Sequence, residues 1–185
     1  MCRYSCRIAA RAVAAFLLAG TVVSANVTVR FDPPSVTLNP GTLFSVAVVA
    51  DIPQPLVGWG LDLTIQNPAI VSVHAAPSIG PLWVSAYAPD GDGLAGLAFP
   101  SSVSGTGVVL ATLSLSADAV GETDLWINVT PGDLSEGFAL DPTGFDTFTV
   151  QAGHVKVPEP ATGLFLLAAG AVVAGRRRAV VRTGG

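Results

Sequence analysis

The chain has 185 residues, of which 50% are apolar and only 12% are charged, against about 25% charged in an ordinary soluble domain. Twelve acidic residues lie between Asn26 and Val157 with only Arg30 and Lys156 to oppose them, a net charge of −10 with His neutral. This field repels phosphate backbones, so nucleic acid is an unfavourable partner. A body of this size can bury a core without a metal or a disulfide, and both cysteines fall within the first six residues.

The first 25 residues have the pattern of a secretory signal peptide. Three arginines fall within the first eleven residues, an apolar run covers 12–22, and small side chains follow in Val23-Ser24-Ala25. The sequence therefore predicts cleavage between Ala25 and Asn26, which leaves a mature chain without cysteine. An uncleaved N-terminal anchor is the alternative, although the apolar run is short for a membrane span.

The C-terminal region contains a stiff segment, an apolar run and a basic cluster, in that order. Val157-Pro158-Glu159-Pro160-Ala161 holds two prolines around one acid, and each proline ring disfavours helix in the residue before it. Residues 161–175 are apolar and would form a helix of about 22 Å, short against a bilayer core of about 30 Å. Arg176, Arg177 and Arg178 follow, and the positive-inside rule keeps them and the tail 179–185 in the cytoplasm.

Together, residues 157–178 resemble the PEP-CTERM sorting signal, in which a Pro-Glu-Pro block precedes a short apolar helix and terminal arginines. The resemblance implies recognition by an exosortase, an integral-membrane processing enzyme, after signal peptidase has acted at the other end. It also implies transient anchoring in the inner membrane, removal of the tail, and release to the cell surface or extracellular matrix of a Gram-negative bacterium. A plain C-terminal membrane anchor is the alternative, because many stop-transfer segments have an apolar run followed by arginine.

The body 26–156 is predicted to be all-β, an antiparallel β-sandwich of eight or nine strands. Period-two alternation of apolar and polar residues indicates strands with one buried face, and turns rich in Gly and Pro separate them. The predicted inward rows are Val27, Val29 and Phe31; Phe44, Val46, Val48 and Ala50; Trp59, Leu61, Leu63 and Ile65; Val109, Ala111, Leu113 and Leu115; Leu125, Ile127 and Val129; and Phe148 and Val150. A bulge at Ala152-Gly153 is expected to turn Val155 and Val157 inward.

Three blocks of this body resemble the cohesin family and its carbohydrate-binding relatives. The blocks are Pro40-Gly41 with 43–50, Val57-Gly58 with 59–61 and 67–73, and 105–113 with Val120-Gly121. The resemblance implies a jelly-roll sandwich that docks a dockerin-type protein or binds carbohydrate. The sequence departs from the family at Gln66-Asn67-Pro68, where cohesins usually have Tyr-Asp-Pro.

The chain shows none of the motifs of the common enzyme classes. Its two histidines, His74 and His154, have no activated serine or set of metal ligands at a suitable spacing. Asp90-Gly91-Asp92-Gly93 offers two alternating carboxylates but lacks the further ligands of a calcium loop, so a tight turn capped by its own side chains is preferred. The sequence therefore predicts a protein that is not an enzyme and holds no cofactor or metal.

Three aromatic residues are candidate ligand contacts. Trp126 falls on the polar side of a predicted strand, and Trp83 and Tyr87 lie in the long connection 75–93, which is expected to be functional or to contain a strand near 82–86. Their rings would stack on the sugars of an exopolysaccharide, and the alternative for each ring is a lid over the sandwich edge. The sequence thus predicts an exported structural or adhesive protein of the cell surface or biofilm matrix, with a carbohydrate-binding or protein-docking module as the alternative.

Overall fold

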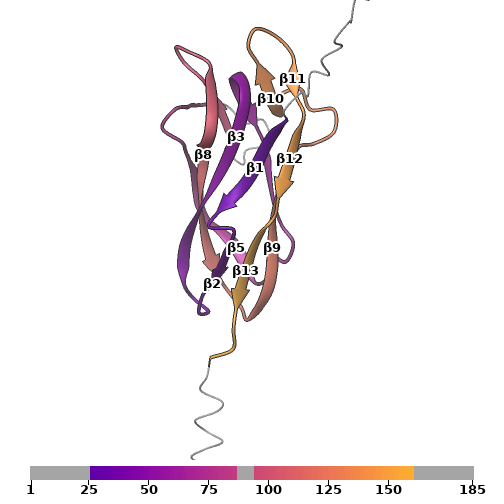
Figure 1. Cartoon of the computed structure of the whole chain (residues 1–185). Coiled ribbons are helices and arrows are strands. Elements are labelled where there is room, and N and C mark those ends of the chain that lie inside the picture. The colour runs from indigo at the N-terminus through magenta and orange to yellow at the C-terminus, as the bar shows by residue number, and fades with distance from the viewer. Residues whose placement is uncertain (1–25, 87–93, 161–185) are drawn as a thin grey trace, which may run out of the picture.

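The computed structural model describes residues 26–86 and 94–160, and these form a β-sandwich (Figure 1). The elements within them are all strands: β1 Val27–Asp32, β2 Ser35–Thr37, β3 Leu43–Gly60, β4 Asp62–Ile65, β5 Val71–Ile79, β6 Val84–Ser85, β7 Ala95–Leu97, β8 Val103–Ala117, β9 Gly121–Asn128, β10 Gly137–Leu140, β11 Phe145–Asp146, β12 Phe148–Gln151 and β13 Gly153–Val157. The predicted all-β class is confirmed, and this part of the chain has no helix able to cross a membrane. The predicted signal peptide 1–25 and helix 161–175 lie outside it.

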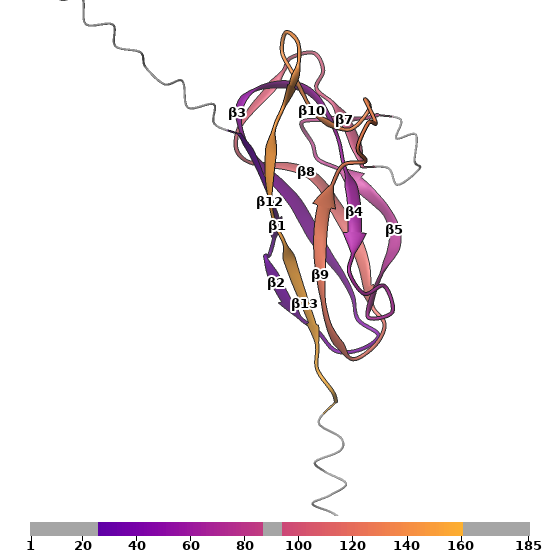
Figure 2. The ribbon, with the colours of Figure 1, turned by 90° about the vertical axis from the view of Figure 1, so that its right-hand side faces the viewer.

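The strands form two sheets that face each other across the core (Figure 2). The large sheet has nine strands along the path β11-β10-β3-β1-β12, with β8, β5, β7 and β6 attached beside this path. Strand β3 lies between β1 and β8 along its first part and between β10 and β7 at its last residues. The small sheet has four strands in the order β2-β13-β9-β4.

The core lies between the sheets, where the inward rows of the two sheets meet. Val27, Val29 and Phe31 of β1 are 0%, 0% and 1% exposed, and Leu125 and Ile127 of β9 are 1% and 3% exposed. These predicted rows are confirmed. Burial of each such side chain contributes about 1.5–3 kcal/mol relative to leaving it in water, so packing alone can stabilise the sandwich.

At three places the chain passes from the large sheet to the small one with no more than two residues between the strands. Strand β1 of the large sheet leads to β2 of the small one, β3 leads through Leu61 to β4, and β12 leads through Ala152 to β13. The predicted change of facing at Ala152-Gly153 is confirmed, because Phe148 and Val150 before it and Val155 and Val157 after it all pack on the core. It occurs where the chain passes to the other sheet and not at a bulge within one strand. Val155 and Val157 are buried in the small sheet, at 0% and 1% exposure.

The first and last strands run parallel to each other, which the predicted antiparallel sandwich does not include. Strand β1 pairs with β12, and β2 pairs with β13, both in parallel. The sheet changes divide what would be single strands into pairs, and short strands lie within the connections. The structure therefore contains more strands than the eight or nine predicted.

The predicted inward row of β8 is wrong at one residue. Val108 and Leu110 are buried, at 7% and 0% exposure, whereas Val109 is only partly buried. The register of β8 against β3 shifts at this point, so that Leu110 is an extra residue in β8. Such a bulge reverses the facing of the residues before it, while the predicted row from Ala111 onward is confirmed.

The long axis of the sandwich separates two ends of different character (Figures 1 and 2). Strands β7, β10 and β11 lie at one end, which we call the distal end. The chain leaves the sandwich after β13 at the opposite end, which we call the C-terminal end. The sequence that follows β13 is the predicted sorting motif.

Candidate functional site

One row of residues crosses the outer face of the large sheet at the distal end. The register places Val84, Leu97, Gly58, Ala139 and Phe145 side by side on five adjacent strands. The small residues occupy the middle of the row, and the large apolar ones stand at its sides. Val84, Leu97 and Phe145 are 55%, 53% and 56% exposed, so the row is an apolar surface in contact with solvent.

All of the row except Val84 lines a groove, which we call the Phe145 groove, with a volume of about 340 Å³. Its floor includes Gly58 and Gly137, and its walls include Leu97 and Phe145. A Cβ on Gly58 would lie 2.9 Å from Leu97 Cδ2, and one on Gly137, where φ is +107°, would lie 3.2 Å from the Phe145 ring. Because glycine has no Cβ, the side chains of Leu97 and Phe145 can approach the backbone at these two positions closely.

A second hollow, of about 410 Å³, adjoins the groove, and we call it the acid hollow. Leu134, Gly137 and Phe145 line both hollows. The acid hollow is further lined by Val129, Asp133, Glu136, Asp146, Thr147 and Phe148. Three carboxylates thus meet aromatic and aliphatic walls, and Leu134, which is 85% exposed, stands at the border of the two hollows.

The carboxylates of the acid hollow differ in their surroundings. Ser135 donates to Asp133 Oδ1 from its hydroxyl at 2.6 Å and from its backbone N–H at 2.8 Å. These hydrogen bonds, the one from the side chain first, hold the pKa of Asp133 below its ordinary value, so the group is ionised. Asp146 Oδ2 is buried and has no hydrogen-bond partner among the described residues. A buried oxygen of this kind favours any donor that enters the hollow.

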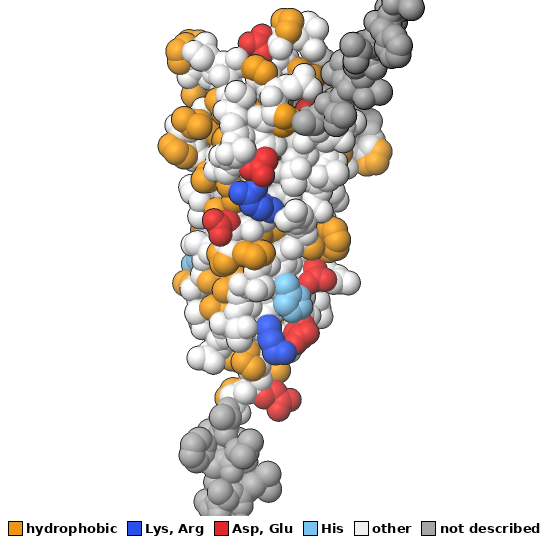
Figure 3. Space-filling model, in the orientation of Figure 1, with side chains coloured by type: hydrophobic (Ala, Val, Ile, Leu, Met, Phe, Trp, Pro, Cys, Tyr) orange, Lys and Arg blue, Asp and Glu red, His pale blue; other side chains and the backbone are white. Residues whose placement is uncertain are grey.

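The described part of the chain brings no cation into the acid hollow. Its Lys and Arg side chains are Arg30, which pairs with Asp51 at 3.0 Å, and Lys156, which pairs with Glu122 at 2.6 Å. Figure 3 shows these cations beside acidic side chains, with hydrophobic side chains at the distal end. No group of His, Cys, Asp or Glu in 26–86 or 94–160 is placed to hold a metal ion.

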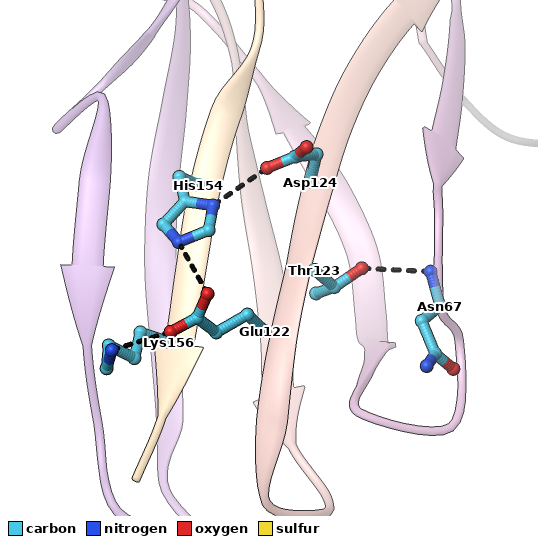
Figure 4. A network of polar contacts seen from close by, with 6 residues as sticks. All are labelled: Asn67, Glu122, Thr123, Asp124, His154 and Lys156. Atoms are coloured by element: carbon cyan, nitrogen blue, oxygen red, sulfur yellow. Dashed lines mark hydrogen bonds and ion pairs between the residues drawn. The ribbon is translucent and has the colours of Figure 1, made fainter.

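The outer face of the small sheet has a second polar cluster, and there each carboxylate faces a basic side chain (Figure 4). His154 Nδ1 lies 2.8 Å from Asp124, and Lys156 Nζ donates to Glu122 at 2.6 Å. Both pairs join β13 to β9, because the antiparallel register sets these residues opposite each other. The hydrogen bond from Lys156, and then its charge, holds the pKa of Glu122 below its ordinary value. This cluster fastens the last strand to its neighbour.

Thr123 is the one buried polar residue of the described chain, at 3% exposure. Its hydroxyl accepts a hydrogen bond from the backbone N–H of Asn67 at 2.9 Å, and Asn67 Oδ1 in turn accepts from Ala69 N at 3.2 Å. Asn67 thus shapes the turn between β4 and β5. The departure from the usual cohesin residues at 66–68 therefore falls in a turn that is tied to the core.

Of the predicted ligand aromatics, Trp83 is buried and Trp126 is exposed. Trp83 is 6% exposed, its Nε1 donates to the Val109 carbonyl at 3.1 Å, and its ring packs edge-on against Trp59 at 6.1 Å. Its predicted exposure is wrong, because the ring belongs to the hydrophobic core. Trp126 is 44% exposed on the outer face of the small sheet, opposite Thr64. Tyr87 lies outside the described residues.

The other predicted residues of the body lie at the surface or outside the described residues. His74 is exposed on β5, and His154 belongs to the polar cluster already described. The loop Asp90-Gly91-Asp92-Gly93 lies outside the described residues. The strand expected near 82–86 is present as β6.

The predicted sorting motif begins directly at the end of the fold. Val157 is the last residue of β13 and is buried, Pro158 is partly buried, and Glu159 and Pro160 are exposed. Ala161 and the cluster Arg176, Arg177 and Arg178 lie outside the described residues, as does Ala25 at the predicted signal cleavage. Asn26, on the other side of that bond, is exposed just before β1.

Sequence reasoning missed Leu97, Leu134 and Phe145, which form the walls and border of the two hollows. These residues come from short strands and a loop that only the fold brings together. One local indication exists, because Phe145 directly follows the turn residues 141–144, where a large apolar side chain has few neighbours to cover it.

Comparison with known proteins finds similarity for both parts of the chain. Residues 156–179 match the PEP-CTERM protein-sorting motif. A non-cellulosomal cohesin from the hyperthermophilic archaeon Archaeoglobus fulgidus is similar in fold, with a TM-score of 0.54 and 15% identity over 72% of this chain and 91% of that one. A chain of the CaDoc0917–CaCohA2 complex at pH 5.5 gives a TM-score of 0.52 and 15% identity over 71% and 99%.

No curated protein sequence matches the chain. The sorting motif marks an exported protein that is anchored transiently in a membrane. Both sequence resemblances, to the sorting signal and to the cohesins, are confirmed. The chain carries a PEP-CTERM sorting motif directly behind a β-sandwich with the fold of the cohesins.

Proposed function

We propose that this protein is processed by an exosortase and then displayed outside the cell as a non-catalytic module that docks a partner protein. Its sorting motif supports export, and its cohesin-like fold supports docking, since one of the similar structures is itself a complex of two proteins. The Phe145 groove is the observation that carries the proposal. Large apolar side chains left exposed together on a rigid sheet are typical of an interaction surface.

The position of the groove supports this function. It lies at the distal end, whereas the chain leaves for the sorting motif at the C-terminal end (Figure 2). A partner can therefore reach the groove while the tail is still held at the membrane. The same partner can stay bound after the tail has been removed.

Site-specific photo-cross-linking in the producing bacterium tests the docking function. A photoreactive amino acid replaces Leu97 in the groove wall, and a second variant carries it at Val73, which is similarly exposed, at 54%, but lies on β5. We expect one protein adduct of defined mass from position 97 and none of that mass from position 73. The same adduct from both positions, or none from either, would contradict docking through the groove.

Trp126 supports a second candidate function, adhesion to an exopolysaccharide. Its ring is 44% exposed, and hydrogen-bonding side chains lie beside it, where Thr64 donates to Asn128 at 3.3 Å. Aromatic rings flanked by polar groups are a common platform for ligands with one apolar and one polar side. Affinity electrophoresis in the host polymer tests this, with retardation that Trp126→Ala abolishes expected for a glycan-binding protein and equal mobility counting against it.

A further inference from the structure

The two hollows at the distal end differ in chemistry but share a border, and this determines what can occupy them. We propose that the Phe145 groove and the acid hollow together bind a segment of a partner protein in which a Lys or Arg side chain lies next to an apolar side chain. This inference rests on the proposed docking function and specifies its partner. The apolar side chain occupies the groove, and the basic one enters the acid hollow.

The shared border places the two partner side chains close together. Leu134, Gly137 and Phe145 line both hollows, so a ligand that fills both must cross the Phe145 ring. Successive residues of an extended chain are separated by about 3.3–3.6 Å. The basic and apolar side chains are therefore separated by only about one or two positions in the sequence of the partner segment.

The charge of the acid hollow selects a basic side chain. Asp133, Glu136 and Asp146 line it, no Lys or Arg does, and Asp146 Oδ2 is buried without a hydrogen-bond partner. A guanidinium or ammonium group supplies donors for that oxygen and forms the stronger, charge-assisted kind of hydrogen bond. The rings of Phe145 and Phe148, which line the hollow, offer apolar surface to the stem of such a side chain.

Other occupants fit less well. The described residues offer no group suited to a metal ion, and carboxylates oppose an anionic lipid surface. In the described body of a second copy, Arg30 and Lys156 are the only Arg and Lys side chains, and both are already paired with carboxylates. A basic segment of another protein is therefore the occupant that complements both hollows.

Three blocked heptapeptides serve as probes in titrations of the purified full-length protein in mild detergent. The first is Gly-Ser-Leu-Arg-Leu-Ser-Gly, the second has Gln in place of Arg, and the third has Ser in place of both Leu. We expect the first to bind roughly tenfold more tightly than either of the others, and to bind more weakly when salt is raised from about 0.05 to about 0.5 M. Equal binding of the three peptides, or no binding of the first, overturns the proposed partner chemistry.

Variants of the protein locate the binding. Asp146→Asn removes the negative charge of the carboxylate whose Oδ2 has no hydrogen-bond partner, and Phe145→Ala removes the wall that the two hollows share. Each variant should therefore bind the first peptide about fivefold more weakly or worse. The matched controls are Asp32→Asn, an exposed carboxylate at the end of β1, and Phe99→Ala, 80% exposed and lining neither hollow. The controls should stay within about twofold of the wild type, and test variants that behave like the controls overturn the assignment.

The two proposals fail in different ways. If the peptides show no preference while the cross-link from position 97 persists, the partner chemistry is wrong and docking stands. If the cross-link is also absent, docking itself is wrong. Circular dichroism of each variant confirms that the sandwich is folded, which is expected because Asp146 and Phe145 are at least partly exposed.

Discussion

The carboxylates in the polar cluster of the small sheet and those in the acid hollow of the distal end have different neighbours. Glu122 and Asp124 each face a basic side chain of β13, at 2.6 and 2.8 Å. The acid hollow gathers three carboxylates with no Lys or Arg in its lining. The first arrangement joins two strands, and the second gathers negative charge beside apolar walls. We therefore propose that the same kind of side chain stabilises the fold in one region and binds a ligand in the other, and that its neighbours decide which.

The largest expected effect tests whether the distal end is part of the core. Phe138 is fully buried beneath the groove, and its ring packs edge-on against Phe148 with centroids 5.3 Å apart. We expect Phe138→Ala to lower the free energy of unfolding by about 3–5 kcal/mol, measured by urea denaturation. The control, Phe145→Ala, removes an exposed ring and should cost no more than about 0.5 kcal/mol. If Phe138→Ala lowered the free energy of unfolding as little as Phe145→Ala does, β10 would not be packed on the core.

A smaller loss is expected at the buried hydroxyl of the small sheet. Thr123→Val keeps the shape of the side chain but leaves the N–H of Asn67 without its acceptor. We expect a loss of about 1–3 kcal/mol in the free energy of unfolding. Thr64→Val removes an exposed hydroxyl that bonds Asn128 and should cost less than about 0.5 kcal/mol. If both variants unfold at the same urea concentration, the Thr123 bond does not secure the turn.

Two matched substitutions, each of which removes one negative charge, compare the effect of a carboxylate on stability in the two regions. Asp124→Asn weakens the link to His154 and should lower the melting temperature by about 1–3 °C. Asp146→Asn removes a charge that Asp133 and Glu136 repel, so its melting temperature should equal or exceed that of the wild type. Differential scanning calorimetry measures both. A clear fall in the melting temperature of Asp146→Asn would show that this carboxylate has a structural role.

The smallest effect concerns pH. The pKa of Glu122 lies below its ordinary value of 4.5 because Lys156 donates to it and attracts it. The native state thus favours the ionised form, so this contribution to stability is present above pH 4.5 and is lost as the pH falls through the lower native value. Glu122→Gln lacks it, and we expect wild type and variant to differ slightly in urea midpoint at neutral pH and to converge in acid. A difference that persists unchanged near pH 2 would contradict the pairing.

The inward rows of β1 and β9 could be predicted because alternation alone reports which face of a strand is buried. The sheet changes could not, since Leu61 and Val155 point inward in either sheet. The burial of Trp83 depends on Trp59 and on the Val109 carbonyl, which belong to other strands. The Phe145 groove likewise depends on the register of five short stretches, which local sequence does not specify.

Hydrogen exchange of the protein recovered from its host tests the docking claim most directly. Two samples are compared. The first is the variant with the photoreactive amino acid at position 97, cross-linked to its partner. The second is the wild-type protein, freed of its partner in high salt. We predict slower exchange in β7, β10 and β11 when the partner is bound, with β9 and β13 unchanged. Protection centred on β9 around Trp126, or no protection in any strand, would contradict the account.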